Sequence, residues 1–371
     1  MNSESQKPVR ALVVAGARPN FMKIAPLLVE LRERGHDARL VHTGQHYDAQ
    51  MSDAFFEDLG IPEPDFHLGV GSASHAVQTA RVMEAFEPVL LETKPDWVIV
   101  VGDVNSTLAC ALVASKLKTA TGVRVAHVEA GLRSHDWRMP EEVNRVLTDR
   151  LSDLLLTPSR DAHENLAREG IDAARVRFVG NIMIDTLHRQ LQKARALDLA
   201  TRLGVPRGGY VLSTLHRPSN VDSPDTLAAV LDALARVADE LPVVIPLHPR
   251  TRKNAEKFGL TRDLARLTVL EPLGYTEMLS LTDGAAVVLT DSGGLQEETT
   301  ALGVPCVTLR EQTERPITLT EGTNRLTPWP MSADSVYASF LEARTGSRNG
   351  ARAPEGWDGH TARRIVEALT D

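Results

Sequence analysis

The chain contains few of the residues that mark several common classes of protein. Only two of its 371 residues are cysteines, Cys110 and Cys306, and both lie in apolar stretches. We therefore expect two buried thiols in a reducing compartment and no disulfide. No run approaches the roughly 18 apolar residues of a membrane-spanning helix, and residues 1–8 lack the apolar centre of a signal peptide. The sequence predicts a cytoplasmic protein with no membrane partner.

Positive charge is also in deficit. The formal net charge is −8, from 41 Lys and Arg against 49 Asp and Glu. This balance argues against a nucleic-acid partner, although a local basic pocket can still hold a phosphate. Aromatic residues are only 4% of the chain, hydrophobic residues 42% and charged residues 24%. Such a composition is typical of a globular enzyme, and the length suits two domains.

Several motifs of nucleotide and metal enzymes are missing as well. No G-x-G-x-x-G follows the first predicted strand, so a tightly bound dinucleotide is not expected. The chain has no P-loop motif and no G-x-S-x-G nucleophile motif. No spacing of His, Cys and carboxylate residues matches a metal site. The sequence therefore predicts no cofactor and no bound metal.

Short apolar runs rich in β-branched residues alternate with helix-like segments along the chain. This alternation predicts an α/β fold with parallel sheets covered by helices on both faces. The charged, helix-like stretch from Asp185 to Gly208 separates two such series. We therefore predict two doubly wound domains, residues 1–186 and 187–357, with residues 358–371 packing back on the first. The predicted strands are Arg10–Ala15, Ala38–Thr43, Trp97–Val101, Val123–Val128, Leu154–Thr157, Val176–Val179, Tyr210–Ser213, Val243–Leu247, Leu267–Leu270, Ala286–Thr290 and Cys306–Leu309.

The stretch from Asp291 to Glu298 is the most informative motif that is present. An apolar run precedes it and a helix-like segment follows, so Ser292-Gly293-Gly294 lies at a turn from strand to helix. Backbone N–H groups at such a turn bind phosphate or diphosphate, and glycines let the ligand approach closely. An ordinary strand–turn–helix corner has the same pattern. The motif alone leaves both interpretations open.

Charged and imidazole side chains follow most of the predicted strands. Ligands of parallel α/β sheets bind beyond the carboxyl ends of the strands, so these side chains are candidates for one shared site. A helix cap or a surface charge explains any one of them, but not the whole set. The candidates are Arg18, Lys23, Gln45, His46, Asp103, Glu129, Arg133, Glu141, Arg145, His216, His248 and Arg315.

The motifs that contain these residues resemble those of the non-hydrolysing UDP-N-acetylglucosamine 2-epimerases. The resemblance runs in family order from about residue 10 to about residue 327, and its most specific parts are His127–Arg133 and Thr290–Glu298. Its other motifs are Gly16–Pro19 with Lys23, Thr43–His46, Gly102-Asp103, Pro140–Arg145, Gly180-Asn181 with Asp185, His216-Arg217 and Thr313–Pro316. The resemblance implies two Rossmann-like domains in a GT-B-like arrangement, with an active-site cleft between them and no cofactor.

The resemblance also implies a reaction, the reversible inversion at C2 of UDP-GlcNAc to UDP-ManNAc. No carbonyl group on the ring activates the C2 proton, so direct deprotonation is costly. In this family UDP is eliminated from C1, a 2-acetamidoglucal stays bound, and UDP adds back with the proton delivered to the other face. That route needs carboxylates at the sugar and cations at the diphosphate. The implied partners are a UDP-sugar substrate and a second copy of the chain in a homodimer, and the implied pathway is the synthesis of cell-envelope polysaccharides.

Individual roles follow from the same resemblance. The implied catalytic residues are Asp103, Glu129, Glu141 and His216. The implied substrate-binding residues are Arg18, Lys23, Gln45, His46, Arg133, Arg145, His248, Leu273, Met278, Ser292, Gly293, Gly294, Glu298 and Arg315. Within this set the Ser-Gly-Gly turn meets the diphosphate, Glu298 the ribose, and Leu273 and Met278 the uracil.

Some positions depart from the commonest form of the family. Val104-Asn105-Ser106 stands where many members have Thr-Thr-Thr, and Asn20 stands where many have Glu. Similar variants occur in relatives that epimerise a UDP-2,3-diacetamido uronic acid, so that sugar is an alternative substrate. A hydrolysing epimerase that releases ManNAc and UDP is a further alternative. A GT-B glycosyltransferase, which would also need an acceptor pocket, is the rival from a different class.

Overall fold

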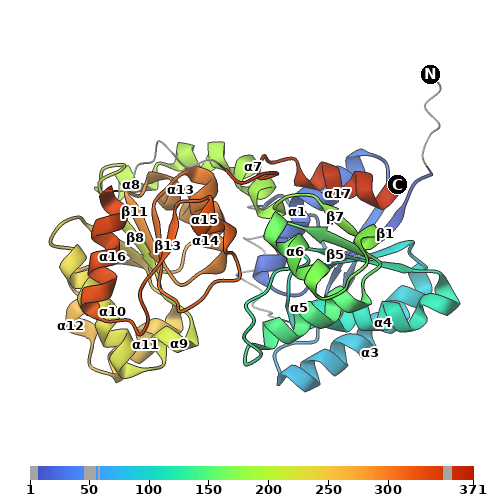
Figure 1. Ribbon diagram of the computed structural model, residues 1–371, viewed down its shortest axis with the longest axis horizontal. Coiled ribbons are helices and arrows are strands. Elements are labelled where there is room, and N and C mark those ends of the chain that lie inside the picture. Colours follow the sequence, from blue (N-terminus) through green and yellow to red (C-terminus); the bar gives the residue numbers. More distant parts are fainter. Residues whose placement is uncertain (1–6, 46–55, 57–58, 346–352) are drawn as a thin grey trace. The chain divides into compact units, whose positions relative to one another are not determined.

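The computed structural model describes residues 7–45, 56, 59–345 and 353–371 (Figure 1). The chain divides into two compact units, each built around its own parallel sheet. Unit 1 takes in residues 1–186 and 355–371, and unit 2 takes in residues 187–354. The chain thus leaves unit 1, completes unit 2 and returns to unit 1.

Unit 1 contains a seven-stranded sheet in the order β3-β2-β1-β4-β5-β6-β7. All neighbouring strands are parallel. The strand order reverses between β1 and β4, which is the switch point of a doubly wound sheet, where ligands bind. The strands are β1 (Arg10–Ala15), β2 (Asp37–His42), β3 (Phe66–His67), β4 (Trp97–Val101), β5 (Arg124–Val128), β6 (Leu154–Thr157) and β7 (Val176–Phe178).

Helices cover both faces of the unit 1 sheet. On one face α1 and α17 pack against each other, and on the other α3, α4 and α5 pack side by side (Figure 1). Buried side chains of α3 and α4, such as Phe86 and Val113, share a core with Val98 and Val100 of β4. The helices are α1 (Arg18–Glu33), α3 (His75–Thr93), α4 (Asn105–Thr121), α5 (Pro140–Leu151), α6 (Arg160–Arg168), the short 3₁₀ helix η1 (Ala173–Arg175), α7 (Ile182–Leu197), which continues into unit 2, and α17 (Thr361–Thr370).

Residues 355–371 are joined to unit 1 by contacts between distant parts of the sequence. Asp185 accepts hydrogen bonds from the backbone N–H groups of Thr361 and Ala362, at 3.0 and 2.8 Å. Trp97 of β4 donates from its indole N–H to the carbonyl oxygen of Leu369 at 3.1 Å. Both ends of α17 are therefore anchored on unit 1.

Unit 2 repeats the same topology with six parallel strands in the order β10-β9-β8-β11-β12-β13. Its switch point lies between β8 and β11. The strands are β8 (Val211–Thr214), β9 (Val243–Pro246), β10 (Thr268–Leu270), β11 (Val287–Thr290), β12 (Cys306–Thr308) and β13 (Asn324–Leu326). The helices are α8 (Leu199–Arg202), α9 (Pro218–Val221), α10 (Pro224–Val237), α11 (Pro249–Lys257), α12 (Thr261–Leu264), α13 (Tyr275–Gly284), α14 (Gly293–Leu302), α15 (Ile317–Thr320) and α16 (Ala333–Thr345).

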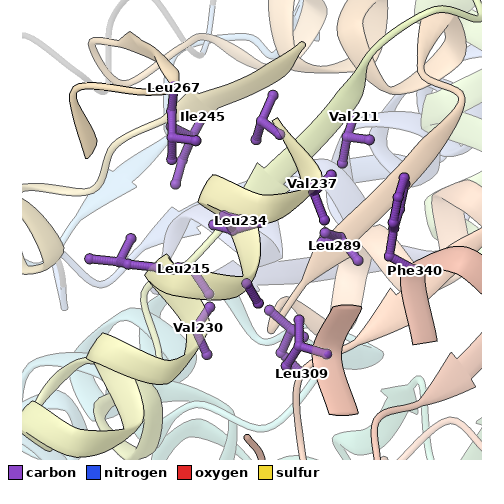
Figure 2. Packing of buried hydrophobic residues seen from close by; sticks show 14 of the residues in the cluster. Val211, Leu215, Val230, Leu234, Val237, Ile245, Leu267, Leu289, Leu309 and Phe340 are labelled. Carbon is purple, nitrogen blue, oxygen red and sulfur yellow. The ribbon is translucent and has the colours of Figure 1, made fainter. Parts of the chain in front are cut away.

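The core of unit 2 consists of two hydrophobic clusters on opposite faces of its sheet. Val287 belongs to one cluster and its neighbour Val288 to the other, because successive side chains of a strand point to opposite faces. The first cluster contains Leu234 of α10, Leu289 of β11 and Phe340 of α16 (Figure 2). The second includes residues of α8 and α13. Burial on both faces explains why these strands are apolar throughout rather than alternating.

The predicted α/β fold with two doubly wound parallel sheets is confirmed. The sequence prediction misses two strands. These are β3, which has only two residues, and β13, which is Asn324-Arg325-Leu326. Both lie at the edge of a sheet, where a strand pairs on one side only and needs no apolar run. Among the described residues, no helix is long and apolar enough to span a membrane.

Candidate active site

Unit 1 places two carboxylates after neighbouring strands of its sheet. Glu129 directly follows β5, where its backbone has a left-handed φ of 70°, which is uncommon outside glycine and often marks functional sites. Its side chain forms an ion pair with Lys23 of α1, and both side chains are almost fully buried. Gly102, after β4, lies against this pair, because a Cβ on it would come 2.9 Å from Lys23 Nζ. The turns after β4 and β5 are therefore packed around one buried ion pair.

Asp103 is the second carboxylate, and two consecutive residues of α5 hold it. Arg145 forms an ion pair with its side chain, and Asn144 donates from its side-chain amide to its backbone carbonyl oxygen at 2.9 Å. Arg145 also pairs with Glu142 one turn earlier in α5. About a third of the Asp103 side chain stays exposed, at 33%. A ligand can therefore reach a carboxylate whose position is already set.

The two glutamates at the start of α5 have opposite environments. Glu142 is 1% exposed and accepts hydrogen bonds from the backbone N–H groups of Ser134 and His135, at 3.0 and 2.9 Å. Burial opposes its ionisation, but the Ser134 N–H and the Arg145 guanidinium outweigh burial and lower its pKa. Glu141 is exposed instead. Glu142 thus holds the loop before α5 in place through its hydrogen bonds to the Ser134 and His135 backbone. Glu141 is the glutamate that a ligand can reach.

Gln45 belongs to a buried polar network at the start of α4. Its side-chain oxygen accepts hydrogen bonds from the N–H and the hydroxyl of Ser106, at 3.0 and 2.8 Å. The neighbouring Asn105 donates to Gln78 of α3 at 2.8 Å and accepts from Asn144 of α5 at 3.2 Å. Asn105 and Ser106, two of the positions that depart from the commonest family form, therefore tie the turn after β2 to α3, α4 and α5.

Arg133 is held by two carboxylates. Its guanidinium lies 2.7 Å from Asp149 and 2.7 Å from Glu169, and its side chain is 1% exposed. Asp149 also contacts Nδ1 of His127 at 2.6 Å and accepts the backbone N–H of Gly131 at 3.1 Å. Burial opposes the charge of Asp149, but the contacts with His127 and Arg133 outweigh it and lower its pKa. Arg133 is thus held in place on the loop that carries Glu129, and its contact with substrate stays a prediction.

In unit 2, His216 and Asp291 meet at the switch point between β8 and β11. Nδ1 of His216 lies 2.8 Å from Oδ1 of Asp291. The fully buried Asp291 also accepts the backbone N–H groups of His216 and Arg217, at 3.0 and 2.9 Å, and the side-chain amide of Asn220 at 3.2 Å. Burial opposes its ionisation, but His216 and the N–H groups lower its pKa. Because the carboxylate accepts from Nδ1, Nε2 of His216 is left to face a ligand.

His248 lies close to His216, with ring centroids 6.3 Å apart. It caps the start of α11, because its Nδ1 accepts the backbone N–H of Arg250 at 3.2 Å. Burial, and then the neighbouring His216, lower its pKa. His248 is therefore a neutral neighbour of His216 at neutral pH.

The predicted phosphate turn begins α14. Ser292 is the extended residue before the helix, and Gly293 and Gly294 are its first two residues. A Cβ on Gly294 would meet nothing within 4 Å, whereas one on Gly293 would lie 2.8 Å from Nη1 of Arg315. The backbone N–H groups of the first helical turn have no partner within a helix. The turn thus presents N–H donors and a guanidinium side by side.

Arg315 belongs to a buried cluster around Glu314. The carboxylate of Glu314 lies 2.8 Å from Nη1 of Arg310, 3.5 Å from Nη2 of Arg217 and 3.7 Å from Nη1 of Arg315. Burial opposes its charge, but the three guanidinium groups hold its pKa well below the usual range. Arg315 also contacts Glu297 of α14, with 3.0 Å between Nε and Oε1.

Glu298 is buried in the first turns of α14. Burial raises its pKa to about 8; the hydroxyl of Tyr275 opposes this rise, and the adjacent charge of Glu297 adds to it. The carboxyl group is therefore mostly protonated at neutral pH and can donate a hydrogen bond. Its contact with a ribose stays a prediction.

The remaining predicted contacts are less defined. Leu273 and Met278 are partly buried and pack on the second hydrophobic cluster of unit 2. His46 and the side chain of Arg18 lie outside the described part of the chain. Among the residues that the structure describes, no group of His, Cys, Asp and Glu could hold a metal ion.

Comparison with known proteins identifies the family. The family model for UDP-N-acetylglucosamine 2-epimerase matches residues 29–370. The chain belongs to this family. A UDP-N-acetylglucosamine 2-epimerase of Methanocaldococcus jannaschii is 39% identical over 366 residues, which cover 96% of this chain and 98% of that protein. A UDP-2,3-diacetamido-2,3-dideoxy-D-glucuronate 2-epimerase of Pseudomonas aeruginosa is 45% identical over 327 residues, which cover 86% of this chain and 88% of the relative.

Solved structures of relatives match the fold of this family member. The M. jannaschii UDP-GlcNAc 2-epimerase, in complex with UDP-GlcNAc and UDP, has a TM-score of 0.88 and 40% identity, and the match covers 97% of this chain and 99% of that one. A sucrose-phosphate synthase of Thermosynechococcus elongatus, at 15% identity and a TM-score of 0.62, shares the fold alone, with a match over 98% of this chain and 95% of that one. The fold is therefore GT-B-like, as the resemblance implies.

Sequence reasoning misses several residues of these sites. The sequence marks Asp291 only as the start of the glycine motif, although it accepts hydrogen bonds from His216, 75 residues away. The sequence marks Glu314 and Arg217 only as members of motifs, and it does not mark Arg310. The available signal was position, because Arg310 comes one residue after an apolar strand-like run. A charge directly after a strand is a candidate for the site at the carboxyl edge of the sheet.

Proposed function

We propose that this family member interconverts UDP-GlcNAc and UDP-ManNAc by inverting C2, without releasing the free sugar. The observation that carries the proposal is the pair of carboxylates Asp103 and Glu129 after neighbouring strands of unit 1. Each is held by its own cation, Arg145 and Lys23 respectively. Two carboxylates fixed in this way suit proton transfer to and from a sugar carbon.

In the proposed reaction the C1–O bond to the diphosphate breaks and the C2 proton moves to a carboxylate of unit 1. A C1=C2 double bond forms, and the sugar becomes a 2-acetamidoglucal. A proton then returns to C2 from the opposite face while a diphosphate oxygen reattacks C1. Asp103, Glu129 and Glu141 are the proposed acid–base groups, which accept and return the proton.

Unit 2 supplies the proposed UDP-binding groups. The leaving diphosphate carries negative charge, which the N–H groups of Gly293 and Gly294 and the guanidinium of Arg315 suit. His216, oriented by Asp291, is proposed to contact the same diphosphate through Nε2. The M. jannaschii relative was solved in complex with UDP-GlcNAc and UDP, which supports a UDP-sugar as the ligand of this family member. On this proposal neither unit carries all of the groups that the reaction needs.

A second candidate substrate is UDP-2,3-diacetamido-2,3-dideoxy-glucuronate. The Pseudomonas aeruginosa relative named for that sugar is 45% identical to this chain. The Asn105–Ser106 network supports the same candidate, because it is built from two of the three residues that depart from the commoner Thr-Thr-Thr form. The chemistry at C2 is the same for both sugars.

Proton NMR in deuterated water tests the proposal with the two sugars supplied separately. The expected result is a mixture of both C2 configurations, deuterium at C2 and no accumulation of UDP. Free ManNAc with UDP would identify a hydrolysing epimerase instead. If neither sugar changes while a supplied acceptor becomes glycosylated, the protein is a transferase and the proposal is wrong.

A further inference from the structure

The acidic residue at the centre of the arginine cluster needs an explanation. Glu314 is 2% exposed and lies next to Arg315, beside the turn that begins α14. A buried negative charge there repels an incoming diphosphate, so by Coulomb's law alone it weakens binding. Its presence is explained only if it contributes something that outweighs that repulsion.

The contacts of Glu314 show what it contributes. One carboxylate oxygen contacts Arg217, and the other contacts Arg310 and Arg315. Three guanidinium groups in so small a volume repel one another, and burial together with the neighbouring arginines lowers the pKa of Arg310. A carboxylate among them is the acceptor that lets all three stay together.

Two of these arginines come from loops at the carboxyl edge of the sheet. Arg217 follows His216 after β8, and Arg315 lies against Gly293. A second bond holds the Arg315 loop to α14, because the hydroxyl of Thr313 donates to Gln296 at 2.6 Å and accepts the N–H of Arg315 at 3.1 Å. Glu314 therefore joins two loops that both face the start of α14.

We propose that Glu314 is a positioning residue that sets the guanidinium groups of Arg217 and Arg315 for a diphosphate at the α14 turn. The inference deepens the proposed function and rests on it for the identity of the ligand. The Glu314 carboxylate has two opposite effects on UDP binding, since its charge repels the diphosphate and its contacts place the arginines. If charge dominates, Glu314→Gln strengthens UDP binding, and if position dominates, it weakens binding.

Glu297 provides the matched control. It is also a buried glutamate in contact with Arg315, so Glu297→Gln changes the net charge by the same amount. The Glu297 carboxylate lies 3.0 Å from Arg315, whereas the Glu314 carboxylate lies among Arg217, Arg310 and Arg315. A difference between the two variants therefore measures position and not charge.

Calorimetry of UDP binding to the full chain shows whether the charge of Glu314 or its positioning of the arginines dominates. We expect Glu314→Gln to lower UDP affinity by at least about tenfold, since an amide must point a donor at a guanidinium. Glu297→Gln is expected to change affinity less than about threefold. Equal or tighter UDP binding by Glu314→Gln would overturn the inference.

Arg310→Lys tests the inference if Glu314→Gln does not fold. Arg310 is only 8% exposed, and lysine keeps the charge but loses the planar donor group. If Glu314 acts by positioning, Arg310→Lys should weaken UDP binding. If only charge matters, UDP affinity should stay the same, so an unchanged affinity would count against positioning. A wild-type protein that binds UDP but epimerises neither sugar would overturn the proposed function and leave this inference standing.

Discussion

Nδ1 of His216 lies 2.8 Å from the carboxylate of Asp291, and the same carboxylate accepts the backbone N–H groups on both sides of that histidine's α-carbon, those of His216 and Arg217. One buried side chain therefore sets both the path of the loop after β8 and the orientation of its imidazole. An acid that fixes a histidine in this way determines which ring nitrogen faces the substrate.

We expect Asp291→Asn to lower kcat by at least about a hundredfold, because the amide can turn a donor toward Nδ1 and so favours the wrong tautomer. The loss should not add to that of His216→Asn in the double variant, since both act through one ring. Steady-state kinetics of the three variants measure this. Asp283→Asn is the control, a buried aspartate paired with Arg195 and Arg207 in the same unit. Additive losses would contradict the assignment.

The neighbouring glutamates of α5 should separate catalysis from stability. Glu141→Gln is expected to lower turnover by at least about a hundredfold with little change in melting temperature, because Glu141 is exposed. Glu142→Gln is expected to lower the melting temperature, because Glu142 accepts two backbone N–H groups. Scanning calorimetry beside the epimerase assay checks both. Normal turnover in Glu141→Gln would remove that residue from the proposed catalytic set.

Asp103→Asn and Glu129→Gln should each cost at least about a hundredfold in turnover while UDP affinity stays within about threefold. The reason is that both carboxylates belong to unit 1, whereas the proposed UDP contacts belong to unit 2. Kinetics and UDP calorimetry on the same preparations measure the two quantities. A parallel loss of UDP binding would show that these carboxylates support the nucleotide site as well.

At the phosphate turn, stability and binding should move in opposite directions. A Cβ on Gly294 meets no atom within 4 Å, and alanine in a helix is about 0.5–1 kcal/mol more favourable than glycine. We therefore expect Gly294→Ala to keep or raise the melting temperature and to lower UDP affinity at least about tenfold, because the methyl group blocks the approach to the backbone. Gly293→Ala would not separate the effect on binding from the effect on stability, because its Cβ would clash with Arg315. Unchanged UDP affinity in Gly294→Ala would argue against the turn as a phosphate site.

The buried Glu298 predicts a pH dependence of stability. Its pKa is about 8 in the folded protein against 4.5 for an unperturbed glutamate, with burial as the main cause. The folded state thus holds this proton more tightly than the unfolded state does. The stabilisation of the fold by protonated Glu298 is therefore fully present below about pH 4.5 and declines as pH rises to about 8. Glu298→Gln should gain melting temperature relative to wild type between pH 5 and about 8, as thermal scans across that range would show. A constant difference between the two proteins would mean that Glu298 is already ionised at pH 5.

Much of this architecture follows from local patterns. β1, β4 and β6 have the predicted bounds, because each is a short apolar run that both faces of a sheet bury. The place of His216 in the site follows from a related rule, because it comes just after such a run and strand ends converge at one edge of the sheet. Strand bounds and the residues at strand ends can be predicted from residues that are adjacent in the sequence.

The partners of these residues could not be found in that way. The bond from Asp185 to Ala362 spans 177 residues, and the contact between Arg217 and Glu314 spans 97. The left-handed backbone of Glu129 has no marker in the sequence either, because glycine is the usual residue at such a φ. These features depend on packing in three dimensions, which composition and periodicity do not encode.

The return of residues 355–371 to unit 1 has a consequence for synthesis on the ribosome. All of unit 2 emerges before α17, so unit 2 can fold as one continuous piece while unit 1 still lacks the helix that Asp185 and Trp97 anchor. We expect nascent chains that are stalled when residue 354 has left the ribosome but α17 has not to carry a protease-resistant unit 2 and a unit 1 that is still cleaved readily. The unit that begins first would then be the one that is finished last.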